Sequence, residues 1–330
     1  MNFYCHDFTG LGSGQGIIRG INTYANYEST YFMIPQKLIK SFIVEPGSEV
    51  NLKKYVTDWT ETDAAKGLGK DVIQAKAEEI LASSRSELAA AQELLYASDS
   101  QSVLIIFQAM DAAGKDGTIS HVMSGVNPQG CQVFSFKRPS SEELDHNFLW
   151  RSMKALPERG RIGIFNRSYY EDVLVVKVHP EMINEAQFGK PDKKFWEKRY
   201  EDINHFEKHL TRNGTLVLKF FLHVSKDEQK KRFLDRLADP KKHWKFDAGD
   251  LAERAHWKDY QRAFEDALSA TSTKKAPWYV IPADHKHVAR ALVAAIIVGA
   301  INGLKLEYPQ LTPEQMAQLA TAKTTLENEV

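Results

Sequence analysis

The chain has 330 residues, which is enough for one large α/β domain or two smaller ones with a well-buried core. Lysine plus arginine and aspartate plus glutamate each number 43, so no overall field favours nucleic acid or a membrane as a partner. The two cysteines, Cys5 and Cys131, form no metal-ligand pattern, and no apolar signal segment opens the chain. The longest apolar run, Ala291–Ile301, is too short to span a bilayer. These features predict a reduced, cytoplasmic protein.

The two ends of the chain differ from the part between them. Residues 1–45 are rich in Gly, Tyr, Asn and Thr and lack periodicity, which predicts a flexible N-terminal extension. Gly10–Gly16 imitates a nucleotide-binding loop, but no strand precedes it, so we give it no role. Residues 46–310 are expected to form one domain, and residues 311–330 a C-terminal tail.

A helix comes first in the expected domain, over Asp71–Tyr96, and strands then alternate with helices. Five short, nearly continuous apolar runs indicate strands of a parallel sheet buried on both faces: Val103–Phe107, Gln132–Phe136, Ile162–Phe165, Leu216–Val224 and Trp278–Pro282. The helical segments between and after them are Thr118–Gly125, Glu142–Ala155, Phe195–Arg212, Lys226–Ala238 and His287–Leu304. This alternation predicts a doubly wound, three-layer α/β domain with a five-stranded parallel sheet, whose ligands bind at the carboxyl ends of the strands.

The loop after the first strand carries the strongest chemical signal. An apolar strand leads through Gly114 and Lys115 into a helical segment. That order lets backbone N–H groups, a helix N-terminus and an ammonium group converge on a phosphate, so it favours phosphoryl chemistry. The expected phosphate contacts are Ala112, Ala113, Gly114, Lys115, Asp116, Gly117 and Thr118. The alternative is a surface turn that binds no ligand.

The loop departs from the common pattern G-x-x-x-x-G-K-[ST] at two positions. Ala109 replaces the first glycine, and Asp116 replaces the hydroxyl residue that holds magnesium. Asp111 and Asp116 bring carboxylates, which hard cations prefer and which would repel phosphate unless a metal lay between them. We interpret Asp111 as a metal ligand or as the group that orients the acceptor oxygen.

Polar residues follow the third predicted strand, at the level where the first strand ends in the loop. Arg167 offers a planar, permanently charged fork for phosphoryl oxygens, and Asn166 stands where common P-loop enzymes place a magnesium-binding Asp. Glu171 and Asp172 are suited to hold a metal or to orient a nucleophile. The alternative for Asn166–Ser168 is a helix cap followed by a surface turn.

A basic helix and loop, Lys230–Asp247, predict a lid over about residues 230–250. Arg232 and Arg236 are four residues apart and share one helix face. Such a segment can close over a transferring phosphate, exclude water and neutralise charge. The alternative is an ordinary basic surface helix.

Two further pairs give weaker signals. Lys137 and Arg138, after the second strand, stand where a phosphate chain or an acceptor could pass. Asp284 and Lys286, after the last strand, stand where P-loop kinases often place contacts to the base. The alternative for both pairs is a surface turn. No Asn-Lys-x-Asp guanine signature is present, which counts against a GTPase.

Taken together, these stretches resemble the polyphosphate kinase 2 family, in particular its class III branch. The matching segments, in chain order, are Gln108–Gly117, Ser124–Gly130, Glu143–Trp150, Ile164–Asp172, Asp239–Lys245 and Ala276–Val280. The similarity runs from about residue 58 to about residue 306, and several motifs in fixed order make it more specific than a lone P-loop.

The resemblance implies a thymidylate-kinase-like P-loop fold with a helical lid. It implies that Asp111 is the essential loop carboxylate and that Lys115 and Arg167 bind the phosphoryl group in flight. The implied lid lies near Arg236–Lys245, and the binding residues expected in and beside it are Arg232, Lys241, Lys242, Trp244 and Lys245. The implied metal is magnesium, with manganese as the alternative, held by Asp111, Asn166 and Glu171. Much of the wider family has Asp at the position of Asn166, whereas Asn matches the class III pattern.

The resemblance also implies a reaction between inorganic polyphosphate and nucleoside mono- and diphosphates. We therefore expect a polyphosphate:nucleotide phosphotransferase that makes ADP and ATP from AMP, ADP and polyphosphate, and that assembles as a homo-oligomer, a dimer or a tetramer. Two alternatives stay open: an ATP-dependent nucleotide kinase of the same fold, and a non-catalytic polyphosphate-binding protein. Neither a nucleic acid nor a membrane is an expected partner.

Overall fold

The computed structural model describes residues 34, 36–62, 65 and 67–329. Its centre is a sheet of five parallel strands in the order β2-β3-β1-β4-β5. The strands are β1 (Ser102–Ala109), β2 (Cys131–Ser135), β3 (Ile162–Asn166), β4 (Thr215–His223) and β5 (Trp278–Pro282). Each strand overlaps one of the apolar runs, so the predicted five-stranded parallel sheet is confirmed. β1 occupies the middle because it is apolar on both faces, and Val103–Ile106 have no exposed surface.

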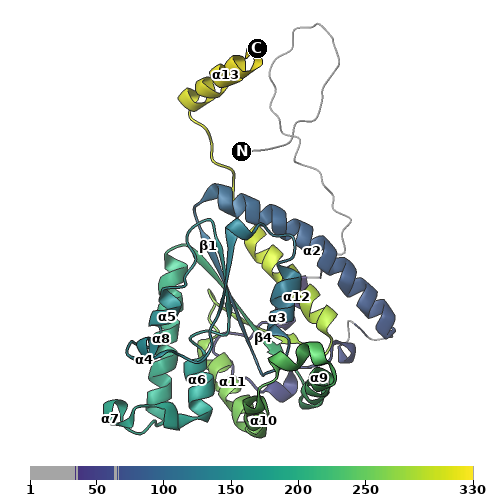
Figure 1. The fold of residues 1–330 in the computed structure, drawn as a ribbon, viewed down its shortest axis with the longest axis vertical. Helices are drawn as coiled ribbons and strands as arrows, with labels where there is room; N and C mark the ends of the chain where they lie inside the picture. The colour runs from purple at the N-terminus through teal and green to yellow at the C-terminus, as the bar shows by residue number, and fades with distance from the viewer. Residues whose placement is uncertain (1–33, 35, 63–64, 66, 330) are drawn as a thin grey trace. The chain divides into compact units, whose positions relative to one another are not determined.

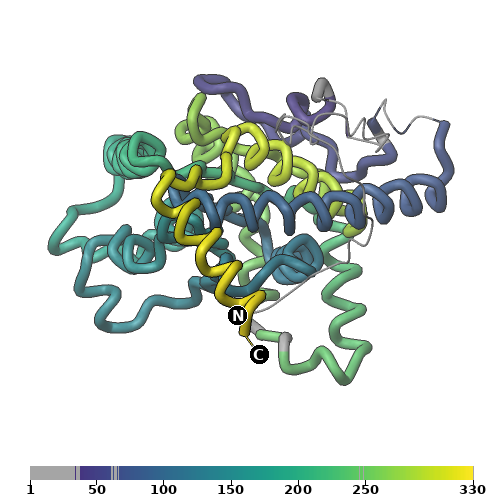
Figure 2. Tube along the Cα trace, turned by 90° about the horizontal axis from the view of Figure 1, so that it is seen from above, coloured from purple at the N-terminus to yellow at the C-terminus, as the bar shows by residue number. Residues whose placement is uncertain are grey.

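Helices cover both faces of the sheet, as the alternation of elements predicts (Figure 1). One face carries α2 (Lys70–Ser98), α3 (Lys115–Val122) and α12 (Lys286–Asn302), and the other carries α6 (Glu171–Val178), α8 (Lys193–Arg212) and α11 (Trp257–Thr271). α2 and α12 run side by side (Figure 2). The expected three-layer α/β architecture is therefore confirmed.

The remaining elements connect or extend these layers. The further helices are α1 (Gln36–Ser41), α4 (Ser141–Leu144), α5 (Trp150–Met153), α7 (Glu185–Phe188), α9 (Lys226–Ala238), α10 (Ala248–Ala255) and α13 (Pro313–Glu327). The 3-10 turns are η1 (Leu52–Lys54), η2 (Trp59–Glu61), η4 (Pro128–Gly130), η5 (Pro180–Met182) and η6 (Pro240–Lys245).

One predicted helix is wrong in its extent. The sequence predicts a single helix over Glu142–Ala155, but the structure has two short ones, α4 and α5. Between them, Asn147 Oδ1 accepts a hydrogen bond from the Leu149 N–H at 3.1 Å. Local bonds of this kind let an Asn side chain compete with the helical pattern. The prediction also omits α6, α10 and α11, which contribute to the site.

The core begins before residue 46. Phe42 and Val44 are buried, and Ile43 forms an antiparallel bridge with Tyr279 of β5. The Val44 N–H donates to the Trp278 carbonyl at 2.9 Å. The predicted boundary of the extension is therefore several residues too late. The rest of that prediction, residues 1–33 with Gly10–Gly16, lies outside the described residues, and α13 occupies the predicted tail with all its residues exposed.

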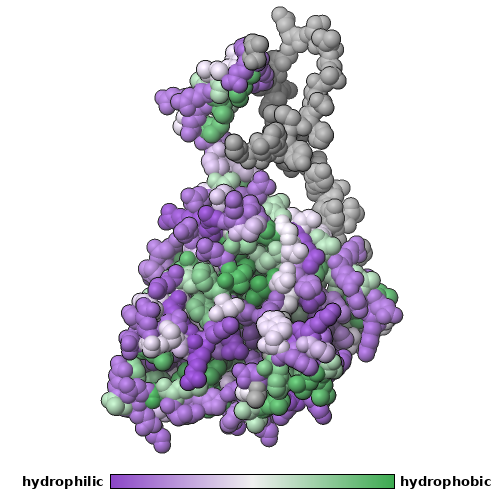
Figure 3. Space-filling model, viewed as in Figure 1, coloured by the Kyte–Doolittle hydropathy of each residue, from purple (hydrophilic) through white to green (hydrophobic). Residues whose placement is uncertain are grey.

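Figure 3 shows that one face of the molecule is largely hydrophilic, with hydrophobic side chains gathered near the middle of that face. Among the helices that the structure describes, none has the length and apolarity that crossing a membrane requires.

Candidate active site

The carboxyl ends of β1 and β3 lie next to each other, because Phe107 pairs in register with Asn166. The residues that follow the two strands therefore meet. Arg167 Nη2 lies 2.8 Å from Asp111 Oδ1, and its Nη1 lies 3.5 Å from Glu171 Oε2. One guanidinium fork thus joins the loop after β1 to the first turn of α6, and it brings together three of the residues that the sequence singles out.

Two non-glycine residues at this junction have left-handed backbone conformations. Ala112 has φ 59° and Arg167 has φ 65°, and such a conformation costs an L-residue roughly 1–2 kcal/mol. Residues of this kind persist where other contacts hold them, and they concentrate at functional sites. The Arg167 N–H donates to the Phe107 carbonyl at 3.0 Å, and the Ala112 carbonyl accepts from Arg232 Nη1 at 3.2 Å.

Lys115 begins α3, directly after Gly114, which has φ 106° and caps the helix. A helix leaves the N–H groups of its first turn without partners inside the helix, so Gly114–Gly117 presents donors at this edge of the sheet. Lys115 Nζ donates to the Ala109 carbonyl at 3.0 Å. Burial lowers the pKa of Lys115 most and Arg167 lowers it further, while nearby carboxylates oppose both.

Asn166 and Asp116 also meet across the two strand ends. Asn166 Nδ2 donates to Asp116 Oδ1 at 2.6 Å and lies 3.5 Å from Ser135 Oγ of β2. The amide nitrogen of Asn166 thus holds a loop carboxylate, which leaves its amide oxygen as the atom that could contact a metal.

Two carboxyl groups of the first turn of α6 have raised pKa values. Burial raises the pKa of Glu171, against the lowering effect of Arg167. Burial likewise raises the pKa of Asp172 to about 6, against Arg199 and Arg151. Carboxyl groups shifted in this way by burial and specific charges are typical of functional sites.

The residues present fit a magnesium ion that is completed by substrate oxygens. Within the residues that the structure describes, no three His, Cys, Asp or Glu side chains gather to hold a metal by themselves. Magnesium is commonly held by one or two carboxylates together with substrate phosphates and several waters. Asp111 supplies such a carboxylate, because its side chain is 26% exposed at the end of the loop. Asn166 and Glu171 stay predicted ligands.

The structure corrects the role of Arg232, which the sequence predicts as a phosphate contact. Its Nη1 donates to the carbonyls of Ala112–Ala113 at 3.2 and 2.6 Å, and its Nη2 to those of Ala283–Asp284 at 2.6 and 3.1 Å. Nε donates to Glu228 Oε1 at 2.8 Å, and the residue is only 6% exposed. Arg232 therefore supports the loop, joining it to the end of β5 through bonds to protein oxygens.

The predicted lid corresponds to the second half of α9, η6 and α10. Arg236 of α9 pairs with Asp250 of α10 at 3.0 Å. Burial and Asp111 raise the pKa of Asp250, whereas Arg236 and Arg167 lower it, so α10 faces the phosphate loop. Asp250 was not predicted as a site residue, because an acidic residue in a polar segment gives no signal of its own.

The other lid residues lie in or beside η6. Lys241 and Lys242 are exposed, and Lys242 Nζ pairs with Asp239 Oδ2 at 2.7 Å. Trp244 is 78% exposed. Lys245 ends η6, and its side chain lies outside the described part of the chain. These residues share one surface segment, so their predicted contact with a substrate stays a prediction.

The remaining predicted residues take different positions. Lys137 and Arg138 are exposed beyond the end of β2, and Lys286 is exposed at the start of α12. The carboxylate of Asp284 accepts from the N-cap N–H of α9 at 2.8 Å, and its expected contact to the base stays a prediction. Thr118 is buried in α3, and its predicted phosphate contact stays a prediction.

Sequence reasoning missed two residues that support the loop. Gln229 is buried, and its Nε2 donates to the Asp111 carbonyl at 2.9 Å. Arg290 lies next to the first turn of α3, because its Nη2 is 3.4 Å from the position that a Cβ on Gly117 would take. The spacing of Gln229 and Arg232, three residues apart on one helix face, is a signal that could have found the first of them.

Comparisons with known proteins identify the family of the chain. The family model described as Polyphosphate kinase 2 (PPK2) matches residues 71–309. An ADP-polyphosphate phosphotransferase of Rhodopseudomonas palustris is 50% identical over 293 residues, which cover 87% of this chain and 98% of that protein. An AMP/ADP-polyphosphate phosphotransferase of Meiothermus ruber is 46% identical over 272 residues, 82% of this chain and 96% of that one.

A solved structure of the same family is also similar to this chain. The crystal structure of polyphosphate kinase 2 from Arthrobacter aurescens superposes with a TM-score of 0.77 at 41% identity and covers 86% of this chain and 96% of that chain. Since the family model spans well over half of the sequence and the relatives match almost from end to end, the chain belongs to the polyphosphate kinase 2 family.

Proposed function

We propose that this protein transfers phosphoryl groups from inorganic polyphosphate to AMP and ADP, giving ADP and ATP, in a reversible reaction that depends on Mg²⁺. One observation carries the proposal: the Asp111 carboxylate stands in the loop between β1 and the N-terminus of α3 and is held by Arg167 at 2.8 Å. The printed names of the relatives from Rhodopseudomonas palustris and Meiothermus ruber support the class of substrates.

In the proposed reaction, an oxygen of the nucleotide's terminal phosphate attacks the last phosphorus of polyphosphate in line. The bond from that phosphorus to its bridging oxygen breaks, and the bridging oxygen keeps the electron pair, so the chain shortens by one phosphate. Such a transfer requires alignment and charge neutralisation more than covalent help. Lys115 and Arg167 are the two cations beside Asp111, and they supply positive charge to the phosphoryl group during its transfer.

The carboxylate of Asp111 orients the acceptor oxygen and holds the metal in this proposal. Asp111, Asn166 and Glu171 would hold Mg²⁺, with Mn²⁺ as the alternative, and the ion would neutralise negative charge on the phosphate oxygens. In this proposal α10, which carries Asp250 near Asp111, and Arg236, which pairs with Asp250, exclude water when the lid is closed.

The decisive test offers AMP, polyphosphate and Mg²⁺ to the purified protein without ATP. The proposal expects ADP and then ATP, with loss of polyphosphate, and no reaction after EDTA. An ATP-dependent nucleotide kinase would give no product under these conditions, and a non-catalytic polyphosphate-binding protein would leave the chain intact with every nucleotide. Either of those results would reject the proposal.

We further propose membership of the class III branch, a homo-oligomer and a cytoplasmic location. A class III enzyme uses both AMP and ADP, so a protein that accepts ADP alone would contradict that assignment. Light scattering on the purified protein tests the assembly, for which a dimer or a tetramer is expected.

A further inference from the structure

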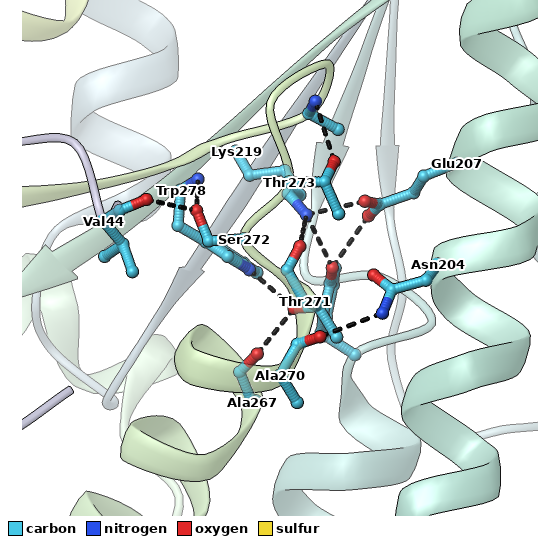
Figure 4. Close-up of polar contacts among 12 residues, drawn as sticks. Val44, Asn204, Glu207, Lys219, Ala267, Ala270, Thr271, Ser272, Thr273 and Trp278 are labelled. Carbon is cyan, nitrogen blue, oxygen red and sulfur yellow. Dashed lines mark hydrogen bonds and ion pairs between the residues drawn. The ribbon is translucent and has the colours of Figure 1, made fainter. Parts of the chain in front are cut away.

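A lysine and a glutamate form an ion pair in the middle of the protein. Lys219 of β4 has no exposed side-chain surface and Glu207 of α8 has 1%, and Nζ lies 2.6 Å from Oε2 (Figure 4). Taking two charges out of water costs several kcal/mol per ion before their attraction is counted. An apolar pair would fill the same space, so packing alone does not account for these residues.

Every polar atom of the pair has a partner. Lys219 Nζ also donates to the Thr271 carbonyl at 2.7 Å and to the Tyr170 hydroxyl at 2.9 Å. Glu207 Oε1 accepts from the Tyr169 hydroxyl at 2.9 Å and from the Tyr170 hydroxyl at 2.7 Å. A fully satisfied buried network fixes one arrangement of the elements that carry it.

The two tyrosines connect this network to the candidate active site. Tyr169 and Tyr170 stand between Arg167 and Glu171 in the chain, in the turn that leads from β3 into α6. Both rings are completely buried. The turn starts from the left-handed conformation of Arg167, so it needs contacts that hold it in place. Two phenols fixed on one carboxylate oxygen supply such contacts.

We propose that Glu207 and Lys219 are positioning residues for phosphoryl transfer: their ion pair anchors the two tyrosines and thereby sets where Arg167 stands. They contact neither polyphosphate nor nucleotide in this scheme. The inference rests on the proposed function, because the displaced group would be the arginine that binds the phosphoryl group. A displacement of about 1 Å at a reacting centre can cost about 100-fold in rate.

The first test removes the two hydroxyls and keeps the rings, in the double variant Tyr169→Phe with Tyr170→Phe. The matched control is Tyr200→Phe, because Tyr200 is another buried tyrosine of the same layer whose hydroxyl accepts from Lys177 at 3.0 Å instead. Both proteins should lose thermal stability. Only the double variant should lose kcat, by about 10- to 100-fold, with KM for polyphosphate and nucleotide changed less than about 3-fold.

A second pair of variants tests the ion pair itself. Lys219→Met alone leaves the Glu207 carboxylate buried without its counter-ion and should lower kcat as the double tyrosine variant does. Adding Glu207→Gln removes that charge and keeps an oxygen that accepts from both phenols, so it should restore kcat by at least about 5-fold over Lys219→Met alone. No recovery in a protein that is folded would overturn the proposal.

Hydrogen exchange gives a readout that does not depend on turnover. The amides of residues 166–173 should exchange faster in the double tyrosine variant than in the wild type, while those of residues 196–204 should not. Unchanged exchange together with kcat within about 2-fold of wild type would make the pair purely structural and overturn the inference. If the wild type transfers no phosphate, the proposed function fails, and the exchange result alone decides the positioning role.

Discussion

Arg167 Nη2 stands 2.8 Å from Asp111 Oδ1, across the ends of two neighbouring parallel strands. This contact orients the loop carboxylate before any substrate arrives, and preorganised charge of this kind costs no rearrangement during the reaction. It also couples the two residues, because the loss of one leaves the charge of the other without its nearest partner.

Asp111→Asn should lower kcat by on the order of 10²–10³-fold, the range seen when one preorganised electrostatic group is removed. The side chain is partly exposed, so the free energy of unfolding should change by less than about 1 kcal/mol. Steady-state kinetics and chemical denaturation measure the two effects. Asp71→Asn, at an exposed position in the first turn of α2, is the control. Turnover close to wild type in Asp111→Asn would refute the assigned role.

Arg167→Lys keeps the charge but removes the fork. A lysine ammonium cannot contact Asp111 and Glu171 in the way the planar guanidinium does, so kcat should fall about 10- to 100-fold. Arg212→Lys, at the exposed end of α8, should leave kcat unchanged. Equal rates for both variants would show that charge without geometry is sufficient at position 167.

Arg232→Met should lower the free energy of unfolding by about 3 kcal/mol, because four buried or partly buried carbonyl oxygens and Glu228 lose a charged donor. kcat should fall as well, since Ala112–Ala113 would no longer be held. Urea denaturation and kinetics measure both. The neighbouring Lys231→Met, on an exposed side chain, should stay within about 0.5 kcal/mol of wild type. Normal stability of Arg232→Met would contradict the support role.

His179 joins the end of α6 to the lid and gives a prediction for pH. Its Nε2 lies 3.0 Å from Glu253 of α10, and its Nδ1 lies 3.0 Å from Glu181. The ring of His256 packs against the ring of His179, and the Tyr260 hydroxyl donates to Glu253. Burial lowers the pKa of His179, but the hydrogen bonds to the two carboxylates outweigh burial, so the pKa lies above its ordinary value of 6.5.

A histidine with a raised pKa in the folded state stabilises the protein fully below its unfolded pKa of 6.5 and loses that contribution as pH rises through the folded value. The stability difference between wild type and His179→Gln should therefore be largest below pH 6.5 and shrink above it. Urea denaturation between about pH 5.5 and about pH 8.5 measures this difference. His205→Gln, at an exposed position of α8, is the control for the replacement of a histidine. A difference that grows with pH would contradict the assignment.

The strands and the centre of the site could be predicted from the sequence for one physical reason. Short apolar runs identify buried parallel strands, and residues that directly follow such strands must gather at one edge of the sheet. That rule brings Asp111, Lys115 and Arg167 together without any knowledge of side-chain contacts. α11 could also have been found, since Tyr260, Phe264 and Leu268 recur at helical spacing along it.

Other features depend on tertiary contacts that local sequence does not encode. α6 is rich in valine, which by propensity favours a strand, yet it is helical where it packs against α8 and α11. A basic residue on a helix looks the same whether its donors face solvent or, as in Arg232, the backbone oxygens of a loop. Lys219 is a charged residue within an apolar strand, which indicates a buried partner, but the sequence does not show that this partner is Glu207 on another element.

Arg232 has a consequence for how the lid opens. Its guanidinium is bonded to two backbone segments of the core, so these bonds hold the first half of α9 in place. We therefore expect a swing of the predicted lid to pivot beyond Arg232, within about one helical turn, and to carry the Arg236–Asp250 ion pair with it. Under that expectation, the backbone around residues 111–117 keeps its bonds to Arg232 while the predicted lid moves.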